Sequence, residues 1–356
     1  MNPRKKVTEA TSPAAPAVTH WDQLIGHDRI RQWLSSAIRS QRFSGSFLLV
    51  GAPGIGKTTV AKLIAKTLLC DSTTPEDMNP CCQCEGCIQV EAETHPDVVR
   101  VAKPADRAVI PIRLLIGPEE ARMQEGFCRD VRVKPLRGQR KVAILQDADF
   151  LNEEGANCLL KTLEEPPAGT VVLVIGTNEQ KQLPTIRSRC RILRLGPLSV
   201  EDSVKLIRQA HRVNTDEREI RAAVEMSGGN IHAAVRLLTS ESDQLRLALT
   251  KQLESATPDP IILSRVISTH VNEAGKEAPI RRDAMRDAFS MSLQFYRRQM
   301  RQQAADDHVD EATLARLDRS IRALHEVDRN ANQASLIECF AADIAAGTTG
   351  DRGGIA

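Results

Sequence analysis

The stretch Gly51-Ala52-Pro53-Gly54-Ile55-Gly56-Lys57-Thr58 decides the fold of this chain. It matches the pattern G-x-x-x-x-G-K-[ST], in which a glycine-rich turn joins a strand to a helix. The apolar run Phe47–Val50 precedes it, and a helical pattern over Thr58–Leu69 follows it, as the motif requires. The backbone N–H groups of such a turn and the N-terminus of the helix point at phosphate oxygens. The sequence therefore predicts a purine nucleotide site.

The residues of this loop have separate expected tasks. Gly54 and Gly56 let the backbone approach the phosphates closely, because neither carries a Cβ atom. Lys57 is expected to reach the β and γ phosphates of ATP, and the Thr58 hydroxyl to hold Mg²⁺. The alternative is a glycine-rich turn that binds nothing.

Apolar runs beyond the loop predict the rest of an α/β domain. Val98–Val101, Val142–Leu145 and Val171–Ile175 read as buried strands, with helical patterns such as Glu153–Glu164 between them. Unbroken apolar strands that alternate with helices indicate a parallel sheet covered on both faces. Beyond Pro197 only helical patterns follow. The predicted organisation is a flexible tail at 1–19, an α/β domain at 20–196, a small helical domain at 197–240, a larger helical domain at 241–345 and a second tail at 346–356.

Composition limits the class of protein. Of the 356 residues, 41% are hydrophobic and 26% are charged, which is typical of a globular chain with a sizeable core. Lys and Arg number 48 against 46 Asp and Glu, so net charge predicts no general affinity for nucleic acid or membranes. The sequence shows neither a membrane span nor an apolar segment behind the early basic residues, and we expect a cytoplasmic protein.

A group of cysteines follows the predicted phosphate-loop helix. Cys81, Cys84 and Cys87 are spaced by two residues each, and Cys70 closes the helix before them. Four thiolates fill a closed tetrahedral zinc site, so we expect structural Zn²⁺ here, with an incidental cluster as the alternative. Cys82 breaks the spacing and is the spare thiol. The remaining cysteines are expected to be ordinary buried residues: Cys128, Cys158, Cys190 and Cys339.

Three further stretches narrow the interpretation. They are Trp21–His27, Leu159–Pro167 and Ser188-Arg189-Cys190. Together with the phosphate loop and the zinc module at 70–87, they make the chain resemble the subunits of the bacterial DNA polymerase III clamp loader, which are AAA+ ATPases. The resemblance is close over about His20–Leu238 and weaker over Leu324–Ile344. It implies an AAA+ domain at 20–196, a helical lid at 197–240 and a helical collar for oligomerisation at 241–345.

The resemblance also implies ligands and partners. Expected partners are the gamma/tau and delta subunits in a hetero-pentamer, the sliding clamp and primer–template DNA. The ligands are ATP with Mg²⁺ and structural zinc. The stretch around Ile25 is expected to pack on the adenine. The implied nucleotide-binding residues are Ile25, Gly51, Gly54, Ile55, Gly56, Lys57, Thr58, Thr59, Asp147 and Asn178.

Departures from the family pattern distinguish two subunit types. An active AAA+ motor ends the strand before this motif in Asp-Glu, where the Asp helps to hold Mg²⁺ and the Glu polarises water. Here Gln146 and Asp147 occupy those positions, and His232 stands where gamma-type subunits place an arginine. We therefore expect a delta-prime type subunit that binds ATP with weak or no hydrolysis. A gamma/tau-type motor in which Gln146 is tolerated is the alternative.

Arg189 carries the remaining expectation. In the resemblance it acts as an arginine finger, completing the ATP site of a neighbouring subunit. The alternative is a solvated surface charge, since Arg187, Arg191 and Arg194 lie nearby. A different class, a nucleoside monophosphate kinase with a zinc lid, fits poorly, because these cysteines directly follow the phosphate-loop helix and the helical half would be unexplained.

Overall fold

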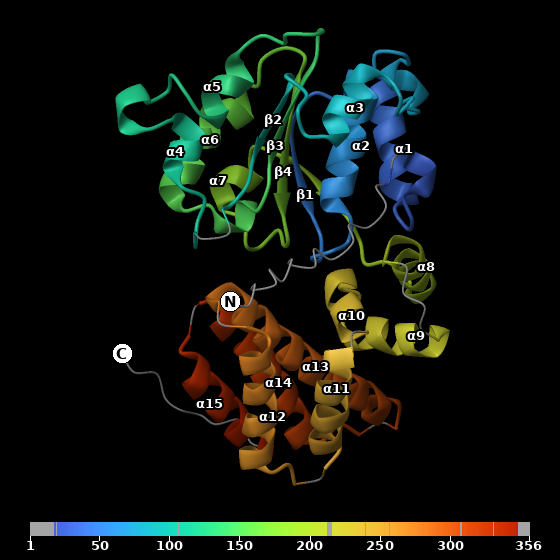
Figure 1. Ribbon diagram of the computed structural model, residues 1–356, viewed down its shortest axis with the longest axis vertical. Coiled ribbons are helices and arrows are strands. Elements are labelled where there is room, and N and C mark those ends of the chain that lie inside the picture. The colour runs from blue at the N-terminus through green and yellow to red at the C-terminus, as the bar shows by residue number, and fades with distance from the viewer. Residues whose placement is uncertain are drawn as a thin grey trace, which may run out of the picture. The chain divides into compact units, whose positions relative to one another are not determined.

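The computed structural model divides the chain into two compact units, Met1–Asp202 and Ser203–Ala356 (Figure 1). The predicted tails lie almost wholly outside the part of the chain that the structure describes. The division of the helical part into a lid and a collar stays a prediction. The described residues are 18, 20–104, 107–211, 216–238, 240–255, 257–275, 277–306, 308–329 and 331–347.

The first unit is built on a sheet of five parallel strands in the order β2-β3-β4-β1-β5. Side chains of β1, β3 and β4 are buried almost throughout, because helices cover both faces. This confirms the predicted α/β phosphate-loop fold. The strands are β1 Gly45–Val50, β2 Val98–Val101, β3 Lys141–Leu145, β4 Thr170–Gly176 and β5 Arg191–Arg194.

The edge strand β5 is absent from the sequence prediction. Its four residues pair with β1, with Val50 opposite Arg194. Only Leu193 is buried, and both arginine ends of the strand are exposed. The apolar run is therefore too short to be predicted as a buried strand. It becomes a strand only by pairing with β1, a segment far away in the sequence.

Helices flank the sheet on both sides, with α1 to α3 on one face and α4 to α7 on the other (Figure 1). The helix α6 begins at Glu153 because the Asn152 side chain accepts a hydrogen bond from the Gly155 amide at 2.9 Å. The α-helices are α1 Asp28–Arg39, α2 Lys57–Leu69, α3 Glu85–Glu91, α4 Ile112–Ile116, α5 Phe127–Arg132, α6 Glu153–Glu164 and α7 Pro184–Arg187. Short 3-10 turns are η1 Trp21–Gln23, η2 Pro75–Asp77, η3 Glu119–Ala121 and η4 Ala148–Phe150.

In the described part of the second unit, every element of regular secondary structure is a helix. Its core includes Phe289 and Phe340, whose ring centroids lie 4.6 Å apart, and the buried Tyr296. Within the described part of the chain, no helix is both long and apolar enough to cross a membrane. The helices are α8 Val200–His211 at the boundary between the units, α9 Glu217–Met226, α10 Ile231–Leu237, α11 Ser240–Leu253, α12 Pro260–Glu273, α13 Ala278–Ala305, α14 Glu311–Asp328 and α15 Gln333–Ala346.

Candidate functional site

The phosphate loop leaves β1 at its carboxyl end and enters α2 at Lys57. Gly54 and Gly56 have φ angles of 78° and 99°, a left-handed region that favours glycine. A Cβ atom on Gly51 would lie 2.7 Å from the Leu195 carbonyl oxygen, so the turn admits no side chain there. The loop thus has the backbone form that a phosphate cradle needs, and Ile55 is buried beneath it.

Lys57 is held inside this loop. Its ammonium donates to the carbonyl oxygens of Gly51 at 2.6 Å and Ala52 at 2.8 Å. Burial lowers the pKa of Lys57, whereas the carboxylates of Asp149 and Asp147 raise it. A buried cation is stabilised by additional negative charge, which a phosphate group would supply.

Two side chains from the stretch before α1 contact α2 and the phosphate loop. The Trp21 indole N–H donates to the Thr67 hydroxyl at 2.8 Å on α2, and the His27 ring lies 2.7 Å from the Ile55 carbonyl oxygen. Both side chains are buried; His27 contacts the loop itself, and Trp21 contacts α2 near its C-terminal end. Ile25 lies between them and is partly exposed, and it remains our predicted contact to the nucleotide base.

Gln146, directly after β3, lies against the loop. Its side-chain amide nitrogen donates to the Thr58 hydroxyl at 3.2 Å, and its oxygen accepts from Arg100 at 2.7 and 3.2 Å. Arg100 also forms an ion pair with Glu93. Arg100 is absent from the residues predicted for the site, although an arginine within the apolar run of β2 is a usable signal.

The other predicted residues lie at the same edge of the sheet. Asp147 has a left-handed φ of 56° and accepts a hydrogen bond from the Lys103 amide at 3.3 Å. The Asn178 side chain accepts from the Gln180 amide at 3.0 Å. Thr59 lies in the first turn of α2. The side chain of His232 falls outside the described part of the structure, so its expected contrast with an arginine stays a prediction.

Asp149 is a carboxylate that the sequence analysis missed. It accepts a hydrogen bond from the Thr177 amide at 2.8 Å and another from the Gln182 side chain. It therefore joins β4, the neighbouring strand, to the turn that follows β3. Its negative charge acts on the phosphate loop by raising the pKa of Lys57.

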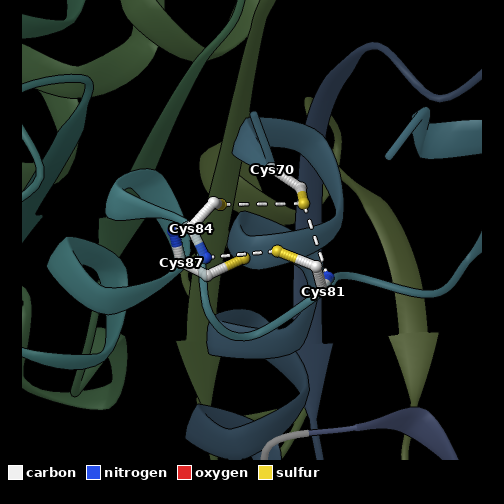
Figure 2. A group of neighbouring side chains, drawn as sticks. All are labelled: Cys70, Cys81, Cys84 and Cys87. Atoms are coloured by element: carbon white, nitrogen blue, oxygen red, sulfur yellow. Dashed lines mark hydrogen bonds between the residues drawn. The ribbon is translucent and has the colours of Figure 1, made fainter. Parts of the chain in front are cut away.

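The four cysteines of the predicted zinc module converge (Figure 2). Their sulfur atoms all lie within 4.8 Å of one another, and those of Cys70 and Cys84 are 3.8 Å apart. A tetrahedral zinc site with Zn–S bonds of about 2.3 Å has sulfur–sulfur distances of about 3.8 Å. Cys70 caps the end of α2, Cys84 caps the start of α3, and Cys87 lies in its first turn. The cluster therefore has the donors and spacing that suit Zn²⁺.

Hydrogen bonds prepare part of this cluster for metal binding. Amide donors at Gln83 and Cys84 lower the pKa of Cys81 to about 6, which favours its thiolate. Burial raises the pKa of Cys87, whose thiolate would need a bound cation for stability. Such a set of thiols is incompletely charged without a metal ion.

The remaining cysteines lie apart from the cluster. The Cys82 sulfur is 3.4 Å from the Pro80 carbonyl oxygen, and among the described residues the only cluster of at least three metal-ligating side chains is the one without it. Cys128 and Cys190 are buried as expected, and Cys158 is half-buried. The expectation of burial is wrong for Cys339, because its position on α15 faces away from the apolar side of that helix.

Ion pairs join the end of α3 and the turn after it to α2 and to Arg100. Glu91, at the end of α3, pairs at 2.5 Å with Lys66, which is almost fully buried on α2. Glu93 pairs with Lys62 at 2.9 Å and also with Arg100. These ion pairs thus hold Glu91 and Glu93 against α2 and against Arg100, the residue that contacts Gln146.

Arg189 lies between α7 and β5 and is held by its own chain. Its Nε donates to the Glu164 carboxylate at 2.6 Å, and its Nη1 donates to the Thr185 carbonyl oxygen at 3.0 Å. Its side chain is 27% exposed. The Arg189 side chain is therefore partly exposed, and α6 supplies its carboxylate partner. Its predicted role toward a neighbouring subunit stays a prediction.

In comparisons with known proteins, residues 26–199 match the model of a family described as "DNA polymerase III, delta subunit". The gamma subunit of DNA polymerase III from Buchnera aphidicola is 30% identical over 62% of this chain and 58% of its own length. The Escherichia coli delta-prime subunit is 29% identical over 63% of this chain and 64% of its own length. The Pseudomonas aeruginosa delta-prime subunit is 39% identical over 44% of each chain.

The matched segments cover between 44% and 64% of the length of these three relatives. Among solved structures, Thermotoga maritima RuvB overlaps 79% of this chain and 80% of its own, with a TM-score of 0.41 at 16% identity, a similarity too low to carry a functional conclusion. The matched segment contains the whole phosphate loop, the cysteine module and Arg189. Residues 26–199, slightly less than half of the chain, thus match the model of this family of DNA polymerase III subunits.

Proposed function

We propose that the chain is a clamp loader subunit of the delta-prime type. In this role it would help to load the sliding clamp onto primed DNA as one member of a hetero-pentamer with gamma/tau and delta subunits. It binds ATP and hydrolyses it weakly or not at all. The relatives named as DNA polymerase III delta-prime, gamma and tau subunits support this class of function.

The observation that carries the delta-prime choice is the side-chain amide of Gln146. In an active phosphate-loop ATPase, a carboxylate at this strand end helps to hold Mg²⁺. A neutral amide that donates to Thr58 and accepts from Arg100 cannot do so. The loop itself is complete, so binding without turnover is the expected behaviour.

We assign structural zinc to Cys70, Cys81, Cys84 and Cys87. The sulfur–sulfur spacing supports this assignment, and all four coordination positions of a tetrahedral ion would be filled by the protein. A closed site leaves no position for a substrate. The metal would therefore stabilise the module and take no part in chemistry.

Arg189 is assigned to the ATP site of the neighbouring subunit. Glu164 supports this role by holding the guanidinium in one orientation at a partly exposed position. To reach a phosphate in the neighbour, the guanidinium would exchange its Glu164 partner for the phosphate oxygens. Both are anionic acceptors that suit its planar donor pattern.

A gamma/tau-type motor is the second candidate. The 30% identity to a gamma subunit and the complete phosphate loop favour it. Phosphate release by the isolated chain, with and without primed DNA, separates the two. ATP turnover typical of an active AAA+ subunit would establish the gamma/tau-type motor and exclude the delta-prime interpretation.

The function is tested by mixing the chain with gamma and delta subunits and measuring assembly, DNA-stimulated ATPase and clamp loading. Arg189→Ala should allow assembly but lower ATP turnover and clamp loading. Arg194→Ala is a matched control, since Arg194 lies on the neighbouring strand and pairs with Glu179. Wild-type turnover in the assembled Arg189→Ala complex would assign Arg189 to surface charge. Failure to assemble with either partner would reject the clamp loader role.

A further inference from the structure

The side of the phosphate loop on which Mg²⁺ would bind, next to Thr58 and Gln146, is called the metal side here. Its side chains differ from those that an active phosphate-loop ATPase presents there. A Mg²⁺ ion on a bound triphosphate needs oxygen ligands, one from the loop hydroxyl and one from a carboxylate on the neighbouring strand. Thr58 provides the hydroxyl, but the position of the carboxylate holds Gln146. The side chains around Thr58 therefore decide whether the ion has a place.

The orientation of the Gln146 amide follows from its partners. An arginine guanidinium only donates hydrogen bonds, so the atom that receives Arg100 must be the amide oxygen. The amide nitrogen is then the atom 3.2 Å from the Thr58 hydroxyl. The side chain that should offer an anionic ligand presents N–H groups toward Thr58 instead.

The Arg100 guanidinium, a permanent cation, contacts the oxygen of this amide. Arg100 binds the amide oxygen with two nitrogens and is itself paired with Glu93. Glu93 also pairs with Lys62 on α2, so the arginine is held from the side of the cysteine module. Rotating Gln146 to offer its oxygen to a metal ion would break both hydrogen bonds from Arg100 and bring a cation near another cation.

The space at this position is small as well. Thr58, Lys62, Glu93, Arg100 and Gln146 help to line a cavity of about 30 Å³. That volume holds about one or two water molecules. Mg²⁺ retains several of its waters when it binds to proteins, so this pocket beside Gln146 offers the hydrated ion no binding place.

The nearby carboxylates do not replace the missing ligand. Asp149 accepts a hydrogen bond from the Thr177 amide and another from the Gln182 side chain. Asp147 accepts from the Lys103 amide, and both carboxylates act electrostatically on Lys57. Within the described part of the chain, neither carboxylate is hydrogen-bonded to the Thr58 hydroxyl.

We infer that this site binds its nucleotide without a coordinated Mg²⁺, because Gln146 and Arg100 occupy the metal side of the loop. Arg100 supplies fixed positive charge there, and Lys57 supplies it on the phosphate side. The ligand would be the metal-free anion of ATP or ADP. This inference rests on the proposed binding of nucleotide and adds the form in which the nucleotide is taken.

The test is equilibrium binding of ATP to the full zinc-loaded chain with and without added Mg²⁺. Buffers should be freed of divalent ions on a resin, because a soluble chelator would also remove zinc. In the wild-type chain, Mg²⁺ should leave the apparent Kd unchanged or weaken binding, since the ion sequesters free triphosphate in solution. A strengthening of about tenfold or more, which corresponds to about 1.4 kcal/mol, would overturn the inference.

A double variant tests the converse case, in which ATP binding should come to depend on Mg²⁺. Gln146→Asp with Arg100→Leu restores the carboxylate and removes the cation, so Mg²⁺ should strengthen ATP binding by about tenfold or more. Arg100→Leu alone is the matched comparison, because its Gln146 amide can offer only a neutral oxygen, and Mg²⁺ should strengthen its ATP binding less than in the double variant. If the double variant folds and stays insensitive, Gln146 and Arg100 do not set the metal requirement, and the inference fails.

The outcomes also separate this inference from the clamp loader role. A wild-type chain that binds no nucleotide in either buffer would overturn the inference. Assembly with gamma and delta subunits and clamp loading would still decide the proposed function independently. Conversely, nucleotide binding insensitive to Mg²⁺ in a chain that fails to assemble would support this inference alone.

Discussion

The phosphate loop and the cysteine module adjoin opposite ends of the same helix, α2, and they differ in whether all of their expected ligand groups are present. Cys70 ends this helix, and Lys57 begins it. All the donors of a tetrahedral metal site are present at one end. At the other end the phosphate cradle is complete, but the metal side is occupied by Gln146 and Arg100.

This difference separates a structural from a catalytic requirement. A structural metal stabilises the fold only if every ligand is kept, because an unfilled position would weaken the binding that folding depends on. A nucleotide site can keep its binding energy and lose the groups that act in the transition state. The two ends of α2 are therefore expected to respond differently to mutation.

Loss of zinc should have the largest effect. In the Cys84→Ser variant, which removes one thiolate, metal content and stability should fall together. Structural zinc binding supplies about 10–16 kcal/mol in small zinc domains, and part of that energy would be lost here. Metal analysis and thermal melting measure the effect. A wild-type chain without zinc, or a variant with unchanged melting, would refute the structural metal site.

The buried ion pair between the module and α2 should rank second. Glu91→Gln leaves the Lys66 ammonium buried without a counter-charge, and breaking a buried pair costs about 3–5 kcal/mol. We expect about 3 kcal/mol, the lower end of that range, because the Glu91 side chain is 36% exposed.

Denaturant unfolding of this variant gives the measurement. Glu85→Gln on the same helix is the matched control, because Glu85 pairs with Arg137 at the surface. A surface pair of this kind contributes about 0–1 kcal/mol. Equal losses in the two variants would show that burial of Lys66 does not matter.

Removal of the loop lysine should change ligand binding more than folding. ATP at about 100 times its Kd stabilises a folded protein by about 2.7 kcal/mol, which appears as a raised melting temperature. Lys57→Ala should abolish this shift, because the phosphates lose their cation. Lys62→Ala, one turn further along α2, should keep it. A shift that persists in Lys57→Ala would place the nucleotide elsewhere.

The smallest effect is expected at Cys82. Its sulfur lies outside the four-sulfur cluster, so Cys82→Ser should retain zinc and change stability by no more than about 0.5 kcal/mol. Comparison with Cys84→Ser under identical conditions tests whether the module distinguishes adjacent thiols. Loss of zinc from the Cys82 variant would redefine the ligand set.

The sequence predicted the features whose parts are close together in the chain. The phosphate loop, four of the strands and α6 were correct because each depends on local spacing or on a continuous apolar run. The convergence of the four cysteine sulfurs followed from the same locality. The edge strand β5 was missed because its identity depends on pairing with β1.

By itself, therefore, the sequence determined the phosphate cradle, the thiol cluster and the parallel sheet that positions them. Only the tertiary structure decided that Gln146 faces Thr58 with its N–H groups, and that Arg189 rests on Glu164. Arg100 and Gln146 are 46 positions apart, and Thr58 and Gln146 are 88 apart. Hydrogen bonds between such residues depend on strand order and helix packing, which no local pattern of residues encodes.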